Sequence, residues 1–306
     1  MRTINLGAAG LDVPTLAVGC MRINKIEKAD TARFVSTALE LGANFFDHAD
    51  IYGDGTCEEI FAKAIAASRV SREQFFIQSK CGIRKGKAFD FSKEHILSSV
   101  DGSLRRLKTE YLDVLLLHRP DALMEPEVVA EAFGALLKTG KVRFFGVSNQ
   151  NPMLIQLLKR YVKQPIVANQ LQLSITNCTM ISQGLHNNMQ DDFAVQRDGN
   201  VLDYCRLNDI TIQPWSPFQH GMFKGVFLDN PEFPALNEKI NEIAKKYSVS
   251  NTTIAFAWLL RHPARMQPVT GTMNIERLKD CVKAAEISLT RDEWYSIFLA
   301  AGNVLP

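Results

Sequence analysis

Four residues that can hold, move or stabilise a proton occur at or soon after apolar runs of the sequence. Asp47 and Tyr52 lie in "FFDHADIYG", Lys80 ends "FFIQSK" and His118 ends "LDVLLLH". A free tyrosine has a pKa of about 10, so a tyrosine that acts as a general acid needs help from a nearby cation. Lys80 can supply that charge, and Asp47 can keep a buried lysine charged and oriented. With His118 as a hydrogen-bond donor, the set predicts an oxyanion-type site for a carbonyl that accepts a hydride.

Each of these side chains, taken singly, is more often structural: an aspartate near a strand end usually caps a turn, and an isolated tyrosine or histidine usually packs. Their shared position argues for chemistry, because each lies at or just beyond the end of a run with the length and residue types of a β-strand. Eight such runs occur, at residues 16–20, 44–48, 75–80, 112–118, 142–149, 166–173, 210–216 and 267–272.

Segments with helical periodicity separate these runs, and several have recognisable ends. The segment that starts at Thr56 has the pattern of a capping box between Thr56 and Glu59, and Asn151 precedes another helix as its N-cap. Gly42 and Gly140 follow two of the segments, where a glycine commonly ends a helix. Strands and helices therefore alternate along the chain.

Alternation of this kind implies parallel strands joined by crossover helices, and eight repeats match the number that closes a barrel. We predict an α/β fold, a (β/α)8 TIM barrel in a single domain over residues 1–306, with an open doubly wound sheet as the alternative. Apolar residues are expected to fill the strand middles. The carboxyl ends of the strands converge on one face, where barrel enzymes build their sites. Further polar or aromatic residues at these ends are Ser148, Asn149, Gln170, Trp215, Ser216 and Thr270.

The composition is that of a globular protein without a dedicated charged surface. Hydrophobic residues make up 46% of the chain, enough to bury a large core without disulfides or metals. The formal charge of +2 gives no broad electrostatic reason to bind nucleic acid or a membrane surface. The start of the sequence lacks a signal-peptide pattern, and no apolar run is long enough to span a bilayer. A cytoplasmic protein is expected.

The cysteines are expected to be free thiols. Six occur, far apart and without a CxxC pair, which favours neither a disulfide framework nor a zinc site. Cys81 follows Lys80, and a nearby cation can lower a thiol pKa. A small apolar residue at a strand end is nevertheless its more usual role.

The order of the motifs resembles the aldo-keto reductase superfamily. "FFDHADIYG", "IQSK", "LLLHRPD", "GVSN", "NQLQLS", "WSPF" and "GTMNIERL" follow one another over nearly the whole chain. The last two are more similar to a bacterial oxidoreductase branch than to the mammalian steroid and aldose reductases. The resemblance implies an NAD(P)H-dependent TIM-barrel enzyme that reduces an aldehyde or ketone. It also implies that Asp47, Tyr52, Lys80 and His118 form the catalytic tetrad, with Tyr52 as the proton donor.

The same resemblance implies where the cofactor lies. The sequence has no GxGxxG, and "GIRKGK" at residues 82–87 is one residue short of P-loop spacing, so neither common nucleotide motif is indicated. The resemblance assigns the nicotinamide carboxamide to Ser148, Asn149 and Gln170. It places Trp215 against the nicotinamide ring. Ser216, the next residue, is also expected to bind the cofactor.

A phosphate site is implied at "TGTMNIERL". Thr272 and Asn274 precede a helical run whose backbone amides can meet a phosphate, and Arg277 supplies charge. This resembles the superfamily's 2'-phosphate site and favours NADPH over NADH. Two features depart from the pattern: Gly271 stands where many members carry a lysine, and residues 279–281 read Lys-Asp-Cys where a Glu-Asn pair usually meets the adenine.

Two other functions remain open at this point. One is a non-catalytic or slow NADP(H)-binding regulatory subunit, which would resemble the potassium-channel β-subunits. The other is a barrel isomerase or aldolase that forms a Schiff base on Lys80. A small-molecule carbonyl substrate is the expected partner, and a monomer is expected. Two long strand-free segments, 174–200 and 217–235, are expected to act as lids over the substrate and cofactor. These segments and residues 20–24 are expected to select the substrate.

Overall fold

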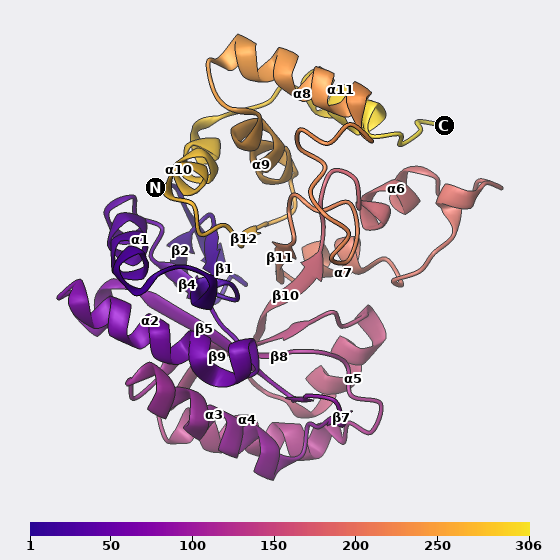
Figure 1. The fold of residues 1–306 in the computed structure, drawn as a ribbon. Helices are drawn as coiled ribbons and strands as arrows, with labels where there is room; N and C mark the ends of the chain where they lie inside the picture. The colour runs from indigo at the N-terminus through magenta and orange to yellow at the C-terminus, as the bar shows by residue number, and fades with distance from the viewer.

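Eight parallel strands form the centre of the molecule (Figure 1). The computed structural model describes the backbone of residues 1–306 and all side chains except those of residues 28 and 29. The strands are β3 (Ala17–Gly19), β4 (Phe45–Asp47), β5 (Phe76–Cys81), β8 (Leu112–Leu117), β9 (Val142–Ser148), β10 (Ile166–Gln172), β11 (Thr211–Trp215) and β12 (Val269–Thr270). Each coincides with one predicted run, so all eight predicted strands are confirmed.

The sheet closes on itself. Its strands follow the order β11-β10-β9-β8-β5-β4-β3-β12. The two outer strands meet where Ile212 donates to the carbonyl of Arg265 and accepts from the amide of Gln267, each at 2.9 Å. The fold is therefore a (β/α)8 barrel, and the alternative of an open doubly wound sheet is wrong.

Helices surround the strands on the outside (Figure 1). They are α1 (Lys28–Glu40), α2 (Thr56–Ala67), α3 (Lys93–Leu107), α4 (Pro126–Lys138), α5 (Pro152–Tyr161), α6 (Thr179–Leu185), α7 (Val201–Leu207), α8 (Pro234–Tyr247), α9 (Asn251–Arg261), α10 (Ile275–Lys283) and α11 (Arg291–Ala300). Short 3-10 turns are η1 (Ile23–Lys25), η2 (Tyr52–Gly55), η3 (Arg72–Gln74), η4 (Asp192–Ala194) and η5 (Ala284–Glu286). Among the described residues there is no helix both long enough and apolar enough to traverse a bilayer.

Three of the four predicted helix ends are confirmed. The side chain of Asn151 caps α5 by accepting the amide of Leu154 at 2.9 Å, and Gly42 and Gly140 follow α1 and α4 with φ of +71° each. The capping box at Thr56 is wrong. The turn η2 runs directly into α2, so Thr56 already has helical backbone angles, and its hydroxyl donates to the carbonyl of Gly53 at 2.6 Å.

An N-terminal hairpin of β1 (Thr3–Leu6) and β2 (Leu11–Pro14) covers the amino ends of the barrel strands. Leu6 and Val13 are fully buried in one apolar cluster with Phe45, Val114 and Val167 from the barrel interior. We call this cluster the barrel floor. The hairpin was not predicted, because its pairing partners and the surface that it covers are distant in sequence.

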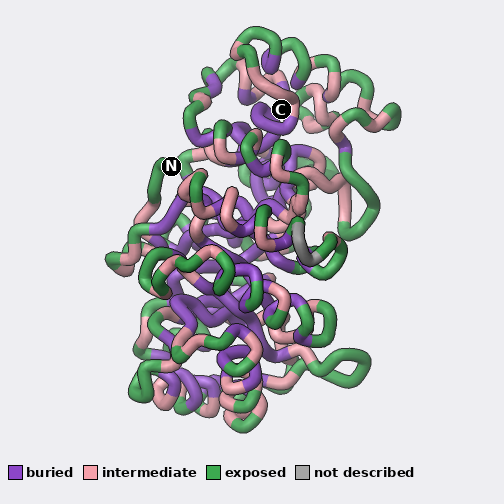
Figure 2. Tube along the Cα trace, turned by 60° about the vertical axis from the view of Figure 1, so that its left-hand side comes forward, coloured by how far each residue is buried: buried purple, intermediate pink, exposed green. Residues whose placement is uncertain are grey.

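The interior is only partly apolar, although buried residues concentrate along the strands (Figure 2). Gln78, Gln213 and Gln267 are fully buried within it. Gln78 and Gln213 exchange hydrogen bonds, at 2.9 Å and 3.0 Å, and Gln213 donates to Gln267 at 2.9 Å. We call these three residues the glutamine layer. The expectation of apolar strand middles is therefore wrong for these strands, and it fails because side-chain amides can satisfy one another across a barrel.

Candidate active site

A cavity of about 840 Å³ opens at the carboxyl ends of the barrel strands. Asp47, Tyr52 and His118 line it, and Lys80 lies directly behind them, fully buried. The predicted cofactor residues line the same cavity: Ser148, Asn149, Gln170, Trp215, Ser216, Thr272, Asn274 and Arg277. The structure thus brings every predicted site residue to one place, although they are spread over more than two thirds of the sequence.

Lys80 is the centre of the polar contacts. It is the next-to-last residue of β5, and its Nζ lies 2.8 Å from Oδ2 of Asp47, 2.8 Å from the carbonyl of His48 and 3.2 Å from the hydroxyl of Tyr52. Burial by itself would lower the pKa of Lys80, but the charge of Asp47 and the hydrogen bonds to Asp47 and Tyr52 raise it overall. The lysine is therefore a fixed cation.

Tyr52 reaches this cation from η2, just past the end of β4. Burial raises the pKa of the Tyr52 phenol, and the positive charge of Lys80 lowers it without cancelling that effect, so the pKa stays above its ordinary value. Tyr52 is therefore a protonated phenol at neutral pH. The lysine acts in the expected direction, and its charge is placed to stabilise a phenolate once the proton has left.

His118 follows β8 and faces the tyrosine. The two ring centroids are 5.9 Å apart with planes at 81°. Burial, together with the charges of Lys80 and Arg119, holds the pKa of His118 well below its usual range, so its imidazole is neutral. Its Nδ1 is buried without a hydrogen-bond partner among the described residues. A neutral imidazole at this position can donate one hydrogen bond to a ligand oxygen.

The neighbouring thiol is unsuited to redox chemistry. Burial, with a smaller effect from the charge of Asp50, raises the pKa of Cys81 well above its ordinary value. The side chain is 1% exposed. The structural role expected for Cys81 therefore fits, and the proximity of Lys80 in sequence does not activate it.

Asp47 joins the site to the glutamine layer. Its Oδ1 accepts from Nε2 of Gln78 at 2.6 Å and from Nε2 of Gln170 at 3.1 Å, while Oδ2 accepts from Lys80. A buried carboxylate needs such partners, because an uncompensated charge in the interior is costly. Sequence reasoning missed Gln78 and Gln213; their only signal was a polar residue within an otherwise apolar strand.

One wall of the cavity is built from the ends of β9, β10 and β11. Asn149 donates to Oγ of Ser148 at 2.8 Å, and Nε1 of Trp215 donates to Oδ1 of Asn149 at 3.3 Å. Gln170 uses its Nε2 for Asp47 and Gln213, at 3.1 Å and 3.2 Å. Its Oε1 is therefore left for a ligand. Asn149 and Ser216 adopt positive φ of 56° and 54°, which turns the chain sharply at the strand ends.

The start of α10 also lines the cavity. The hydroxyl of Thr272 accepts the amide of Asn274 at 3.1 Å, and Oδ1 of Asn274 accepts the amide of Arg277 at 3.0 Å. The amides of residues 275 and 276, in the first turn, have no such cap among these contacts. Uncapped amides at a helix start favour an anion. A ligand that carries both a phosphate and a planar amide would suit these two groups of residues.

Comparison with known proteins identifies the family of this chain. The profile of the Aldo/keto reductase family matches residues 15–298. This chain belongs to the aldo/keto reductase family. It is 35% identical to the oxidoreductase YcsN of Bacillus subtilis, with 98% of each chain covered, and 31% identical to a 6-dehydroglucose reductase of Agrobacterium fabrum, with 95% of each covered. A solved structure of a thermostable aldo-keto reductase superposes with a TM-score of 0.79 at 26% identity, over 98% of this chain and all of that one.

Two arginines were not predicted as cations of the site, although Arg22 lies in the segment 20–24 that was expected to select the substrate. Nη1 of Arg22 donates to the carbonyl of Gly271 at 3.2 Å. A guanidinium from the loop after β3 therefore lies beside Gly271, the position at which the family resemblance implies a lysine. The guanidinium of Arg119 lies 5.6 Å from the ring of Trp215. Both line the cavity. Arg119 directly follows the predicted strand 112–118 and Arg22 lies two residues after the predicted strand 16–20, which was the signal that could have found them.

Apart from the polar residues described above, most of the cavity lining is apolar. The segment 217–235, predicted as a lid, contributes Phe218, Met222, Phe223 and Val226 to them. The hairpin of β6 (Ile83–Arg84) and β7 (Ala88–Phe89) contributes Ile83 and Phe89, and it occupies the "GIRKGK" stretch. The segment 174–200 holds α6 and η4, and no residue of it lines this cavity.

Proposed function

We propose that this oxidoreductase of the aldo/keto reductase family reduces an aldehyde or ketone to an alcohol with NADPH, and that Tyr52 donates the proton. One observation carries the proposal: the Tyr52 hydroxyl lies 3.2 Å from the buried Lys80 ammonium, beside a neutral His118, in a cavity large enough for a cofactor and a small substrate. Protonated phenol, fixed cation and hydrogen-bond donor are the three groups that a developing alkoxide needs.

The protein groups divide the work as follows. NADPH, when bound, supplies the hydride. His118 donates a hydrogen bond that orients the substrate oxygen next to Tyr52. Tyr52 gives its proton to that oxygen as negative charge develops there, and Lys80 stabilises the resulting phenolate. Asp47 holds Lys80 in place at 2.8 Å and keeps it charged.

The cofactor proposal rests on two groups of residues that line the cavity. Ser148, Asn149 and the free oxygen of Gln170 suit the nicotinamide carboxamide, and the face of Trp215 suits the ring. Thr272, Asn274 and Arg277, with the first amides of α10, suit a 2'-phosphate. Arg22 adds a second guanidinium beside Gly271. These groups favour NADPH over NADH.

A Schiff base on Lys80 finds no support. Nucleophilic lysines need a lowered pKa, whereas the pKa of Lys80 is raised and its Nζ already has three oxygen neighbours. No observation supports the hypothesis of a regulatory subunit either. The single domain, the monomeric state and the cytoplasmic location stay predictions.

The test is a carbonyl screen with a matched blank. Purified protein is mixed with NADPH and a panel of aliphatic, aromatic and sugar aldehydes and ketones. The panel includes 6-dehydroglucose, because one relative is named 6-dehydroglucose reductase. Nucleotide oxidation and alcohol formation are both measured. We expect at least one carbonyl to give equal amounts of NADP and alcohol, with turnover at least about 10²-fold slower by Tyr52→Phe. A panel without carbonyl-dependent oxidation, or equal turnover by Tyr52→Phe, would overturn the proposal.

A further inference from the structure

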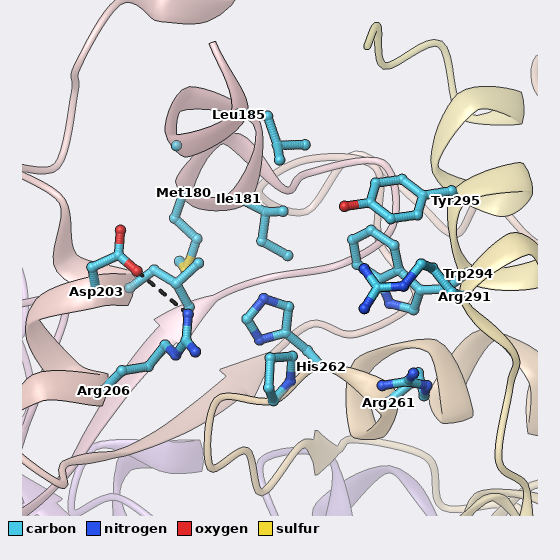
Figure 3. Close-up of a pocket in the computed structure, with 13 residues that line it drawn as sticks. Met180, Ile181, Leu185, Asp203, Arg206, Arg261, His262, Arg291, Trp294 and Tyr295 are labelled. Atoms are coloured by element: carbon cyan, nitrogen blue, oxygen red, sulfur yellow. Dashed lines mark ion pairs between the residues drawn. The ribbon is translucent and has the colours of Figure 1, made fainter. Parts of the chain in front are cut away.

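A second cavity, of about 410 Å³, lies apart from the active site (Figure 3). It is enclosed by α6, α7, the end of α9 and the start of α11, and it shares no lining residue with the larger cavity. Its volume is within the range of small-molecule sites. The proposed reduction leaves this cavity without a role.

Its rim is cationic. Arg206, Arg261 and Arg291 contribute guanidinium groups from three different helices, and Asp203 is the one acidic residue among the lining side chains. Of the three, only Arg206 forms an ion pair with another residue drawn in Figure 3, and that contact, to Asp203, is long at 3.6 Å. Arg261 uses Nε for the carbonyl of Leu289 at 2.6 Å. The cavity therefore has more positive charge than its own residues neutralise.

A neutral histidine lies among these arginines. Nδ1 of His262 accepts the amide of Ala264 at 3.0 Å, which places the ring proton on Nε2. Burial and the charge of Arg206 lower the pKa of His262 to about 4, so it does not add to the positive charge. Figure 3 shows its ring in the middle of the cavity, between Arg206 on one side and Trp294 on the other. His262 can thus donate one uncharged hydrogen bond to a ligand.

The rest of the lining is apolar apart from the hydroxyl of Tyr295. Ile181 and Leu185 of α6 face Trp294 of α11 across it (Figure 3). Trp294 stacks on Trp258 with centroids 4.6 Å apart, and each indole N–H donates to the other residue's carbonyl, at 3.1 Å and 3.0 Å. Since the indole N–H is already used, Trp294 offers a ligand only an apolar surface.

We propose that this cavity binds a small organic anion: a carboxylate or phosphate group on an aromatic or short aliphatic body. The guanidinium groups would pair with the anion, because their planar forks match carboxylate and phosphate oxygens. The body would lie between α6 and Trp294. An uncharged molecule of the same shape would leave the cations unpaired, so the site discriminates by charge.

The test compares ligands and variants by titration calorimetry on the full chain. Benzoate and phenyl phosphate are the anionic probes, and benzyl alcohol is the neutral one. We expect Arg291→Ala and Arg206→Ala each to weaken anion binding about tenfold, the equivalent of ~1.4 kcal/mol, with benzyl alcohol binding far more weakly than either anion. Arg33→Ala, an exposed arginine of α1 that lines neither cavity, is the control and should bind like the unmodified protein.

A second variant separates this cavity from the active site, where an aromatic anion could also bind. Ile181→Trp fills the space beside Trp294 and should abolish anion binding while the melting temperature and NADPH binding stay close to those of the unmodified protein. A fall in melting temperature would move the test to the arginine variants alone. Anion affinity unchanged in Arg206→Ala and Arg291→Ala, or equal affinity for benzyl alcohol, overturns the proposal. Whichever of benzoate and phenyl phosphate binds more tightly identifies the anionic group.

Discussion

The same strands supply apolar side chains to one end of the barrel interior, the floor, and polar or charged side chains to the other end. We call this second end, which holds Asp47, Tyr52, Lys80 and His118, the mouth. Strand β4 gives Phe45 to the floor and Asp47 to the mouth, and β8 gives Val114 to the floor before the chain reaches His118. The floor is entirely apolar, whereas the mouth buries a cation, a carboxylate and several amides. Burial stabilises the floor without requiring partners. At the mouth every charge needs a partner, so stability there depends on the same contacts as the proposed chemistry.

The largest expected effect comes from removing the cation of the mouth. Lys80→Met should lower the turnover number by a factor of about 10²–10³, the loss typical when one group that stabilises developing charge is removed. It should also cost about 3–5 kcal/mol of unfolding free energy, because Asp47 is left buried and unpaired. Carbonyl turnover and urea unfolding measure the two losses.

The double variant Asp47→Asn/Lys80→Met separates the two losses. It should recover much of the stability, since no lone charge remains, without recovering turnover. Recovery of both, or of neither, would show that stability and chemistry do not depend on the pair as described.

The floor should behave in the opposite way. Leu6→Ala truncates a fully buried side chain of the hairpin and should cost about 2–5 kcal/mol of unfolding free energy. Turnover and the KM for the carbonyl should not change at temperatures where the variant is folded. A large loss of turnover in folded Leu6→Ala would show that the two ends are coupled.

A smaller effect, on cofactor binding, is expected from changing the start of α10. Arg277→Ala should weaken NADPH binding about tenfold or more, because a hydrogen bond to a charged group contributes about 1.5–3 kcal/mol, and it should leave NADH binding nearly unchanged. The control is Lys279→Ala, which removes an exposed cation of the same helix that pairs with Glu276. Equal losses for both nucleotides would mean that Arg277 does not contact a 2'-phosphate.

The smallest effect is expected from pH. The pKa of His118 is lowered and that of Tyr52 is raised, so neither group changes charge between about pH 6.5 and 9, given ordinary values of about 6.5 and 10. The turnover number for reduction should therefore be nearly constant over that range. It should fall only as pH rises through the raised pKa of Tyr52, where the donor loses its proton. A steep change near neutral pH that His118→Ala abolishes would contradict a neutral imidazole.

The sequence was sufficient for the elements that depend on local patterns. The eight strands were found because each is a short apolar run between turn residues. The proximity of Asp47, Tyr52, Lys80 and His118 was predictable because each lies at or just beyond the end of a strand. Contacts between distant segments were not predictable in this way. The glutamine layer forms only when β5 and β11 come together in space. The arginine-lined cavity needs α7, α9 and α11 side by side. The N-terminal hairpin packs on barrel strands that are distant in sequence. Gly55 preceding α2 was missed because η2 merges with the helix.

The most direct test of the account is the rate of the chemical step itself. Protein saturated with NADPH is mixed rapidly with a saturating carbonyl from the screen, and nucleotide oxidation is followed through one turnover for the unmodified protein and for Tyr52→Phe. Removal of the proton donor predicts a rate lower by about 10²–10⁴, with equal affinity for NADPH. Equal single-turnover rates in the two proteins would contradict the assignment of Tyr52 as the donor.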